Sequence, residues 1–188
     1  MGNFYTNYTL RGPGQREVVA FLDGRAAIVT PQQEGCVVVF DKNSEEQDQH
    51  AIGDLASRLS RWFNCPVLAV QNHDDDVLWY QLFLNGKLAD EYDSTPGFFD
   101  PEAQPSPPEG GEAQKLCGAF GSSDIGEIEE ILRRPSFGEN AYSFAVERHA
   151  DLVRVLGIPT FGVGAGYHYI CDGQLPEGLD PEDLIWVS

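Results

Sequence analysis

Hydrophobic and polar residues alternate most regularly in residues 77–93, VLWYQLFLNGKLADEYD, and this period of two predicts a pair of antiparallel strands. Asn85-Gly86 lies between the two halves, and this dipeptide tolerates the positive φ angles of a type I′ turn. A two-residue turn fixes the register, so Leu84 should lie opposite Lys87. The register then predicts one aromatic-rich face formed by Val77, Trp79, Phe83, Leu88 and Tyr92.

The two strands of this hairpin differ on their other face. The first strand is apolar there as well, whereas the second carries Lys87, Glu91 and Asp93. We therefore expect the first strand to be interior to a sheet and the second to lie nearer its edge.

Shorter patterns predict the elements that precede this hairpin. Residues 3–10 form a strand, residues 15–23 an amphipathic helix, and residues 25–30 and 36–41 a second hairpin. Ser44 and Gln47 form a capping-box pattern that opens a helix ending at Asn64, and residues 66–71 form a buried strand. The predicted fold is α+β, with an antiparallel or mixed sheet of ferredoxin-like βαββαβ order plus an extra hairpin.

Composition changes sharply after residue 94. Residues 95–112 are rich in Pro and Gly and predict a linker, in which Phe98 or Phe99 should pack back onto the first unit. Helical patterns follow at 112–120, 123–132 and 140–156, and residues 160–163 and 167–171 are expected to form a short hairpin. The predicted units are therefore residues 1–94, an α+β sheet unit, and residues 113–188, a helix-rich part that packs on it.

Two segments of the second part have alternative interpretations. RVLGIPTFGV (154–163) resembles RWFNCPVLAV (61–70), which indicates either a duplicated helix–Pro–strand–hairpin unit or a coincidence of common turn chemistry. Gly162, Gly164 and Gly166 superficially match a phosphate-binding loop, but a strand is expected after them, and phosphate loops precede helices.

The formal charge of −18 is the most unusual bulk property. It disfavours nucleic acid and anionic membranes and favours encounter with a cationic partner. No apolar run approaches the roughly 18–20 residues that cross a bilayer, and no secretory signal precedes the first strand. The four cysteines lack metal-binding or redox spacing, which predicts free thiols and a cytoplasmic location.

Candidate chemistry is concentrated in the segment NHDDD (72–76). His73, Asp74 and Asp76 are candidate ligands for a divalent metal ion, although the segment matches no EF-hand loop. A solvated turn, with Asp76 or Asn72 bonding local backbone, is the simpler interpretation. Candidate catalytic residues are His73, Asp75, Asp90 and His149, of which Asp90 is expected to share a face with Trp79.

Three stretches, WYQLFLNGKLADEYDSTPGFF, RHADLVRVLGIP and GQLPEGL, resemble segments of a group of uncharacterised bacterial proteins. The resemblance spans most of the chain and implies a bacterial source. Because no activity is assigned to that group, it implies no catalytic residues.

The leading functional hypothesis is a non-catalytic, acidic binding protein that recognises a basic protein partner, as acidic immunity proteins do, without a cofactor. It follows from the charge and from the lack of any complete catalytic motif. One alternative is a metal-assisted hydrolase that uses the loop from His73 to Asp76. Another is a structural protein that self-associates through the edge strand at 87–93. The sequence leaves the oligomeric state open.

Overall fold

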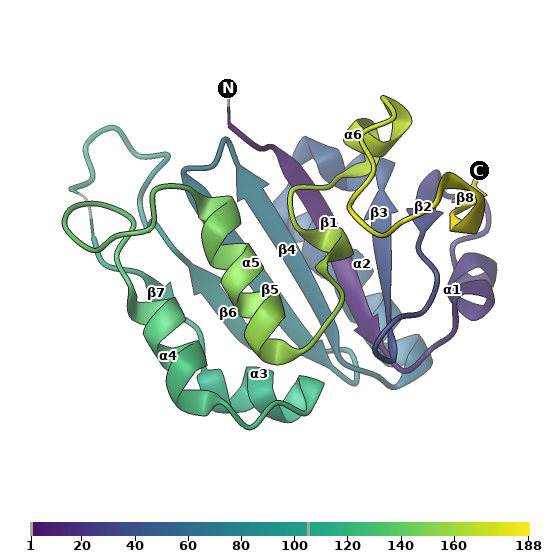
Figure 1. Cartoon of the computed structure of the whole chain (residues 1–188), viewed down its shortest axis with the longest axis horizontal. Coiled ribbons are helices and arrows are strands. Elements are labelled where there is room, and N and C mark those ends of the chain that lie inside the picture. Colours follow the sequence, from purple (N-terminus) through teal and green to yellow (C-terminus); the bar gives the residue numbers. More distant parts are fainter. Residues whose placement is uncertain (1, 105) are drawn as a thin grey trace.

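The computed structural model describes residues 2–104 and 106–188, so Met1 and Pro105, the latter within the predicted linker, lie outside the described residues. These residues form an open antiparallel sheet of eight strands in the order β7-β6-β5-β4-β1-β3-β2-β8 (Figure 1). The strands are β1 (Tyr5–Arg11), β2 (Ala27–Val29), β3 (Cys36–Asp41), β4 (Val67–His73), β5 (Val77–Leu84), β6 (Lys87–Asp93), β7 (Glu109–Gly110) and β8 (Ile185–Val187).

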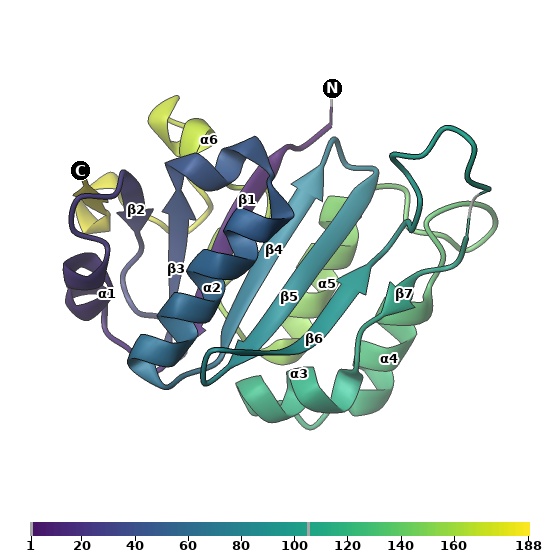
Figure 2. The same cartoon turned by 180° about the vertical axis from the view of Figure 1, so that it is seen from behind.

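Helices cover both faces of the sheet (Figures 1 and 2). One face packs against α1 (Gln15–Phe21) and α2 (Gln49–Phe63), and the other packs against α3 (Ala113–Phe120), α4 (Ile125–Arg133) and α5 (Ala145–Leu156). A smaller cluster joins β2 and β3 to η2 (Thr160–Gly162) and α6 (Tyr167–Cys171). The 3₁₀ helices η1 (Lys42–Glu46) and η3 (Pro181–Asp183) complete the secondary structure of the described residues.

The α+β class and the antiparallel pairing agree with the sequence. The predicted 25–41 hairpin is present as β2 and β3, and β5 is interior, between β4 and β6. The sheet extends further than predicted, because β7 forms within the predicted linker and β8 pairs with β2. None of the described helices is both long enough and apolar enough to cross a membrane.

The β5–β6 hairpin turns at Asn85-Gly86 as predicted, with φ angles of 52° and 77°. The register is also as predicted at Leu84–Lys87 and Phe83–Leu88, but it shifts at the next pair, where Leu82 lies opposite Asp90. This irregularity leaves Ala89 without an opposite residue, which is the effect of a β-bulge.

The bulge overturns the predicted aromatic face. Trp79 and Phe83 face α2, whereas Tyr92 is turned to the other side, where its ring stacks on Tyr80 with centroids 5.2 Å apart. Leu88 remains 50% exposed. One extra residue reverses the alternation of every later side chain in the strand, so Asp90 does not share a face with Trp79 either.

The predicted C-terminal hairpin is wrong. Residues 160–162 form η2 and residues 167–171 form α6, so the second copy of a duplicated helix–Pro–strand–hairpin unit, one of the two interpretations of the sequence similarity, lacks its strand and hairpin. Tertiary contacts override the strand propensity here. The Asn7 amide donates to the carbonyls of Gly162 and Ala165, and Tyr167 N donates to the Glu45 carboxylate. The Glu45 carboxylate therefore accepts a hydrogen bond from the first residue of α6, a segment that the sequence predicts to be a strand.

The start of the second helix also differs from its prediction. Ser44 lies inside η1, whose N-cap is Asp41, and Gln47 adopts a left-handed conformation with φ 56°. α2 begins after Asp48, whose carboxylate accepts from His50 N and Ala51 N, and it ends at Asn64 as predicted. The chain therefore bends once before the helix starts.

Candidate functional site at the β4–β5 turn

The turn between β4 and β5 contains two aspartates in left-handed conformation, Asp74 with φ 53° and Asp75 with φ 64°. Such angles are uncommon for non-glycine residues, and Asp and Asn tolerate them best. The backbone of the turn is fixed from outside the hairpin, because Asp75 N donates to the Asn3 carbonyl at 3.1 Å. It also donates to the Asn72 side chain at 3.0 Å.

The Asp75 carboxylate joins three elements. Its Oδ2 accepts from the backbone and side-chain amides of Asn3 at 3.0 and 2.8 Å, and its Oδ1 accepts from Asn72 Nδ2 at 3.0 Å. Its Oδ1 also accepts from Val146 N at 3.3 Å, and its carbonyl accepts from Ala145 N at 2.8 Å. Asp75 therefore caps the first turn of α5 from a distant part of the chain and places a negative charge at its N-terminus.

His149, one turn further along α5, is fully enclosed. Its Nδ1 lies 2.7 Å from the Tyr5 hydroxyl, and the two rings stack with centroids 5.8 Å apart. Burial lowers the pKa of His149 to about 4, and burial raises the pKa of Tyr5. The imidazole is thus neutral near pH 7, and one hydrogen bond joins its Nδ1 to the Tyr5 hydroxyl. This pair is a satisfied buried hydrogen bond.

His73 faces a different cavity from Asp75 and Asp76. Its Nδ1 lies 2.7 Å from Gln47 Oε1, and its ring contacts Phe4 and Phe99 with centroids 5.1 and 4.9 Å away. Asp74 accepts from Gly2 N at 2.8 Å. Within residues 2–104 and 106–188, no group of three or more His, Cys, Asp or Glu side chains is arranged to hold a metal ion. The geometry does not gather the three candidate metal ligands in one place.

Asp90 lies apart from this turn, opposite Leu82 on the α3–α5 face. It is buried, and its carboxylate accepts from the Tyr80 hydroxyl and from Glu112 N, both at 2.8 Å. These bonds attach α3 to the sheet. The four predicted catalytic candidates therefore lie in separate places, and Asp75 shares a cavity with Asp76, one of the candidate metal ligands.

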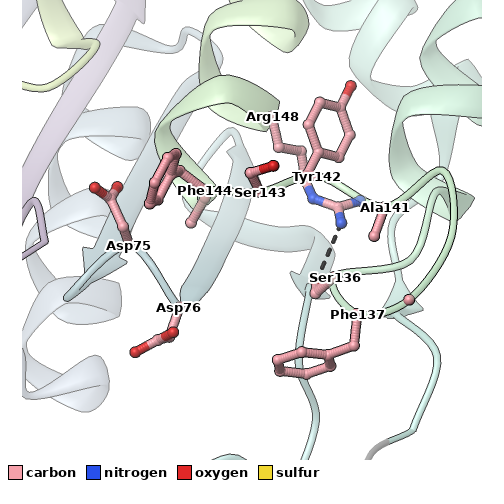
Figure 3. A pocket seen from close by; sticks show the side chains of 11 residues that line it. Asp75, Asp76, Ser136, Phe137, Ala141, Tyr142, Ser143, Phe144 and Arg148 are labelled. Carbon is pink, nitrogen blue, oxygen red and sulfur yellow. Dashed lines mark hydrogen bonds between the residues drawn. The ribbon is translucent and has the colours of Figure 1, made fainter.

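That cavity lies between the β4–β5 turn, the start of α5 and the loop before it, and has a volume of about 400 Å³. Figure 3 shows Asp75 and Asp76 on one side and the Arg148 guanidinium on the other, with Ser143 and Phe144 between them. Phe137 lies below the guanidinium, and Tyr142 lies beside it. The lining is thus acidic at one end and basic at the other.

Arg148 is only 1% exposed. Its Nη1 donates at 2.8 Å both to the Tyr92 hydroxyl and to the Ile131 carbonyl, and its Nη2 donates to Ser136 Oγ at 3.2 Å. The guanidinium carbon lies 4.6 Å from the centre of the Tyr142 ring. Burial lowers the pKa of Arg148. In the part of the chain that the structure describes, no carboxylate forms an ion pair with this guanidinium.

Five exposed phenylalanines lie around the same end of the sheet, and we call them the phenylalanine edge: Phe4, Phe98, Phe99, Phe137 and Phe144. Each is between 38% and 62% exposed. Phe4, Phe98 and Phe99 surround the His73 ring. Phe98 and Phe137 line one cavity, and Phe137 and Phe144 line the Arg148 cavity. The five rings are therefore linked through His73 and through two shared cavities.

Carboxylates line the cavities beside these rings. The cavities beside the phenylalanine edge are lined by five of them: Glu46, Asp48, Asp75, Asp76 and Asp100. Arg148 is the one Lys or Arg in the described lining of these cavities, and it is buried. The exposed charge of this end is therefore negative.

Sequence reasoning predicted that Phe98 or Phe99 would pack on the first unit, and both contact His73 in β4. It missed Phe137, Phe144 and Arg148. A signal for Arg148 was present, because Arg148, Leu152 and Val155 follow the three- and four-residue spacing of a buried helix face. Phe137 lies in an aperiodic loop and gave no such signal. No family model, curated protein or solved structure matches this chain.

Proposed function

We propose that this protein is a non-catalytic binding protein that recognises a basic protein partner, as acidic immunity proteins do, and that the phenylalanine edge is its contact surface. The observation that carries the proposal is the collection of five exposed phenylalanines among carboxylates at one end of the sheet. Scattered exposed apolar residues are normal in proteins, whereas a contiguous apolar group bordered by polar residues is typical of an interaction surface.

The chemistry of this surface suits a partner with arginine and lysine side chains. A guanidinium or ammonium group can lie over an aromatic ring while it pairs with a neighbouring carboxylate. Aromatic residues also contribute strongly to the binding energy of protein interfaces. The net charge of −18 would accelerate encounter with a positively charged partner and repel an acidic one.

The test uses a fluorescent peptide of alternating Arg and Leu, with a Glu–Leu peptide of equal length as the negative probe. We expect the double variant F98A/F99A to bind the Arg–Leu peptide at least about tenfold more weakly in fluorescence anisotropy, because both rings are exposed. Phe98 and Phe99 do not line the Arg148 cavity, so that cavity is unchanged.

The matched control is Trp62→Ala, which removes an exposed aromatic ring on α2, outside the phenylalanine edge. Its affinity should stay within about twofold of the original protein. Equal losses in the control and the double variant, or no binding of the Arg–Leu peptide to the original protein, would contradict the proposal. Binding should also weaken as salt is added, because charge pairs are screened.

We also propose that β1 to β4, with α1 and α2, form a ferredoxin-like unit to which the other strands are added. The order β4-β1-β3-β2 inside the sheet and the packing of α1 and α2 in one cluster support it. An experimentally determined structure of the protein tests this proposal, because a parallel β1–β3 pair would contradict it.

The two alternatives from the sequence stay predictions. Calorimetric titration with Mg²⁺, Mn²⁺ and Zn²⁺ tests the metal-assisted hydrolase, since a metal at the β4–β5 turn would release heat and raise the melting temperature. Sedimentation at high concentration tests self-association through residues 87–93. Part of that strand already has neighbours, because Tyr92 and Asp93 pair with β7 and Lys115 donates to the Ala89 carbonyl.

A further inference from the structure

We propose that the Arg148 cavity binds a small zwitterion, a free α-amino acid with an apolar side chain. The carboxylate would pair with Arg148, and the ammonium would pair with Asp76. This inference concerns a small-molecule site and does not depend on the protein partner proposed above. Three features of the cavity carry it: a buried cation without a carboxylate, a carboxylate pair on the opposite side, and aromatic rings on the wall.

The first feature is the uncompensated charge of Arg148. A buried charge is costly unless it is paired, and the guanidinium stays protonated because its pKa is too high for it to become neutral. Its hydrogen bonds to Tyr92, Ile131 and Ser136 give its N–H donors acceptors, but all three acceptors are neutral oxygens, so the positive charge is not balanced. A carboxylate in the cavity would neutralise the charge and form a strong charge-assisted hydrogen bond.

Arg148 also has a structural role, because the Ile131 carbonyl belongs to the last turns of α4, where cations are favoured. That role uses Nη1. The bond from Nη2 to Ser136 Oγ is longer, 3.2 Å against 2.8 Å, and Ser136 itself lines the cavity. The side of the guanidinium that carries Nη2 is therefore the one that a ligand can reach (Figure 3).

The second feature selects a zwitterion over a simple anion. Asp75 and Asp76 line the same cavity, so a ligand with only negative charge would be repelled by two carboxylates. Asp75 already accepts four hydrogen bonds. Asp76 is exposed, and its backbone is fixed by bonds with His73 and Thr95, so its carboxylate is the one available to an ammonium group.

The third feature determines the side chain. Phe137 and Phe144 are exposed rings on the cavity wall, and they would contact an apolar or aromatic side chain of the ligand. The volume of about 400 Å³ lies within the range of about 300–1,000 Å³ typical of small-molecule sites. The lining thus combines groups of opposite charge with exposed aromatic rings beside them.

The test is isothermal titration of the full chain with L-phenylalanine, 2-phenylethylamine and 3-phenylpropanoate. The second compound lacks the carboxylate and the third lacks the ammonium. We expect L-phenylalanine to bind with a Kd of roughly 1 mM or lower, and each single-charge analogue to bind at least about tenfold more weakly. No heat with L-phenylalanine, or equal affinity for all three compounds, overturns the proposal.

Two matched variants locate the site. D76N should weaken L-phenylalanine at least about tenfold while leaving 3-phenylpropanoate unchanged or tighter, because it removes one carboxylate from the cavity. D74N makes the same charge change in the same turn, outside the cavity lining, and should leave the Kd within about twofold. Equal effects of the two variants overturn the assignment. R148Q should abolish binding, and if it fails to fold, the D76N and D74N pair still decides.

Discussion

The two turns at opposite ends of β5 reach similar backbone angles in different ways. At the β5–β6 turn, Asn85 and Gly86 have φ angles of 52° and 77°, and at the β4–β5 turn, Asp74 and Asp75 have φ angles of 53° and 64°. The first pair is a common local solution for a hairpin. The second pair uses two charged non-glycine residues where glycine costs least.

The β5–β6 turn needs little from the rest of the chain. Its sequence sets the angles, and α2 adds two contacts, because Ser57 Oγ donates to the Gly86 carbonyl at 2.7 Å and Gly86 N donates to Ser60 Oγ at 3.0 Å. These bonds attach the turn to the helix. The hairpin is therefore visible in the sequence.

The β4–β5 turn depends on residues far away in the chain. Left-handed non-glycine residues cost about 1 kcal/mol or more each, and they persist where the surroundings hold them in place. Here the surroundings are Asn3 before β1 and the first turn of α5. The difference teaches that local chemistry explains one turn, whereas tertiary bonds explain the turn beside the candidate site.

The largest expected effect comes from removing the Asp75 carboxylate. Asp75→Ala leaves Asn3, Asn72 and Val146 without their shared acceptor and places alanine at φ 64°, so we expect a loss of about 3–5 kcal/mol in the free energy of unfolding. Urea denaturation measures it. Asp75→Asn is the control, because it keeps one acceptor oxygen and tolerates the angle, and it should lose less. A change below about 0.5 kcal/mol in Asp75→Ala would show that these bonds contribute little.

The next effect is pH dependence beside this turn. Burial lowers the pKa of His149 to about 4 from an ordinary value of about 6.5. The unfolded chain therefore takes up a proton below about pH 6.5, and the folded chain does so only near pH 4. Stability should fall as pH decreases through this window, by about 3 kcal/mol in total.

Other groups also titrate in this range, so the comparison must be made with His149→Gln. Burial raises the pKa values of Glu45 and Asp93, which gives the opposite slope, and these groups are unchanged in the variant. Subtracting the two curves of unfolding free energy against pH isolates His149. Parallel curves between about pH 4 and pH 6.5 would mean that His149 is protonated as easily in the folded state as in the unfolded one.

The smallest effect belongs to the local turn. A Cβ at Gly86 would lie 2.7 Å from Arg61 Cβ at φ 77°, so Gly86→Ala should cost about 2 kcal/mol. Gly24→Ala is a close control, because Gly24 has φ 76° and nothing within 4 Å of its ideal Cβ. It should cost about 1 kcal/mol, which is the conformational part alone. Thermal unfolding of both variants measures the difference, and equal losses would remove the role given to Arg61.

The same contrast explains how much of the fold the sequence could predict. Period-two alternation and the Asn-Gly turn predicted the β5–β6 hairpin correctly as far as Leu88. The shift beyond Phe83 was not predictable, because Ala89 has no distinctive turn chemistry, and one unpaired residue reversed the side of Tyr92 and Asp90. Residues 167–171 have a strand-forming composition but form a helix, because the Glu45 carboxylate accepts a hydrogen bond from Tyr167 N in the first turn of that helix.

For the candidate site, the sequence drew attention to a segment that lines two of the cavities at this end of the sheet, but it did not reveal how the side chains of the segment are distributed. The segment from Asn72 to Asp76 does border the phenylalanine edge, but its side chains point into separate environments. The left-handed turn at Asp74 and Asp75 sends His73 and Asp75 to different cavities, which a cluster of ligands in the sequence cannot reveal. Phe137, Phe144 and Arg148 come from the far half of the chain and join the site only through folding.

β1 lies in the middle of the sheet, between β3 and β4. During synthesis on the ribosome, Tyr5–Arg11 emerges early, but its second neighbour is complete only when residue 73 has emerged. At about 5–20 residues per second, this strand spends several seconds with one side unpaired. A nascent chain arrested before that point would expose unpaired backbone N–H and C=O groups and apolar side chains of β1, so the central position of β1 makes the completion of β4 the step that commits the sheet to its final order.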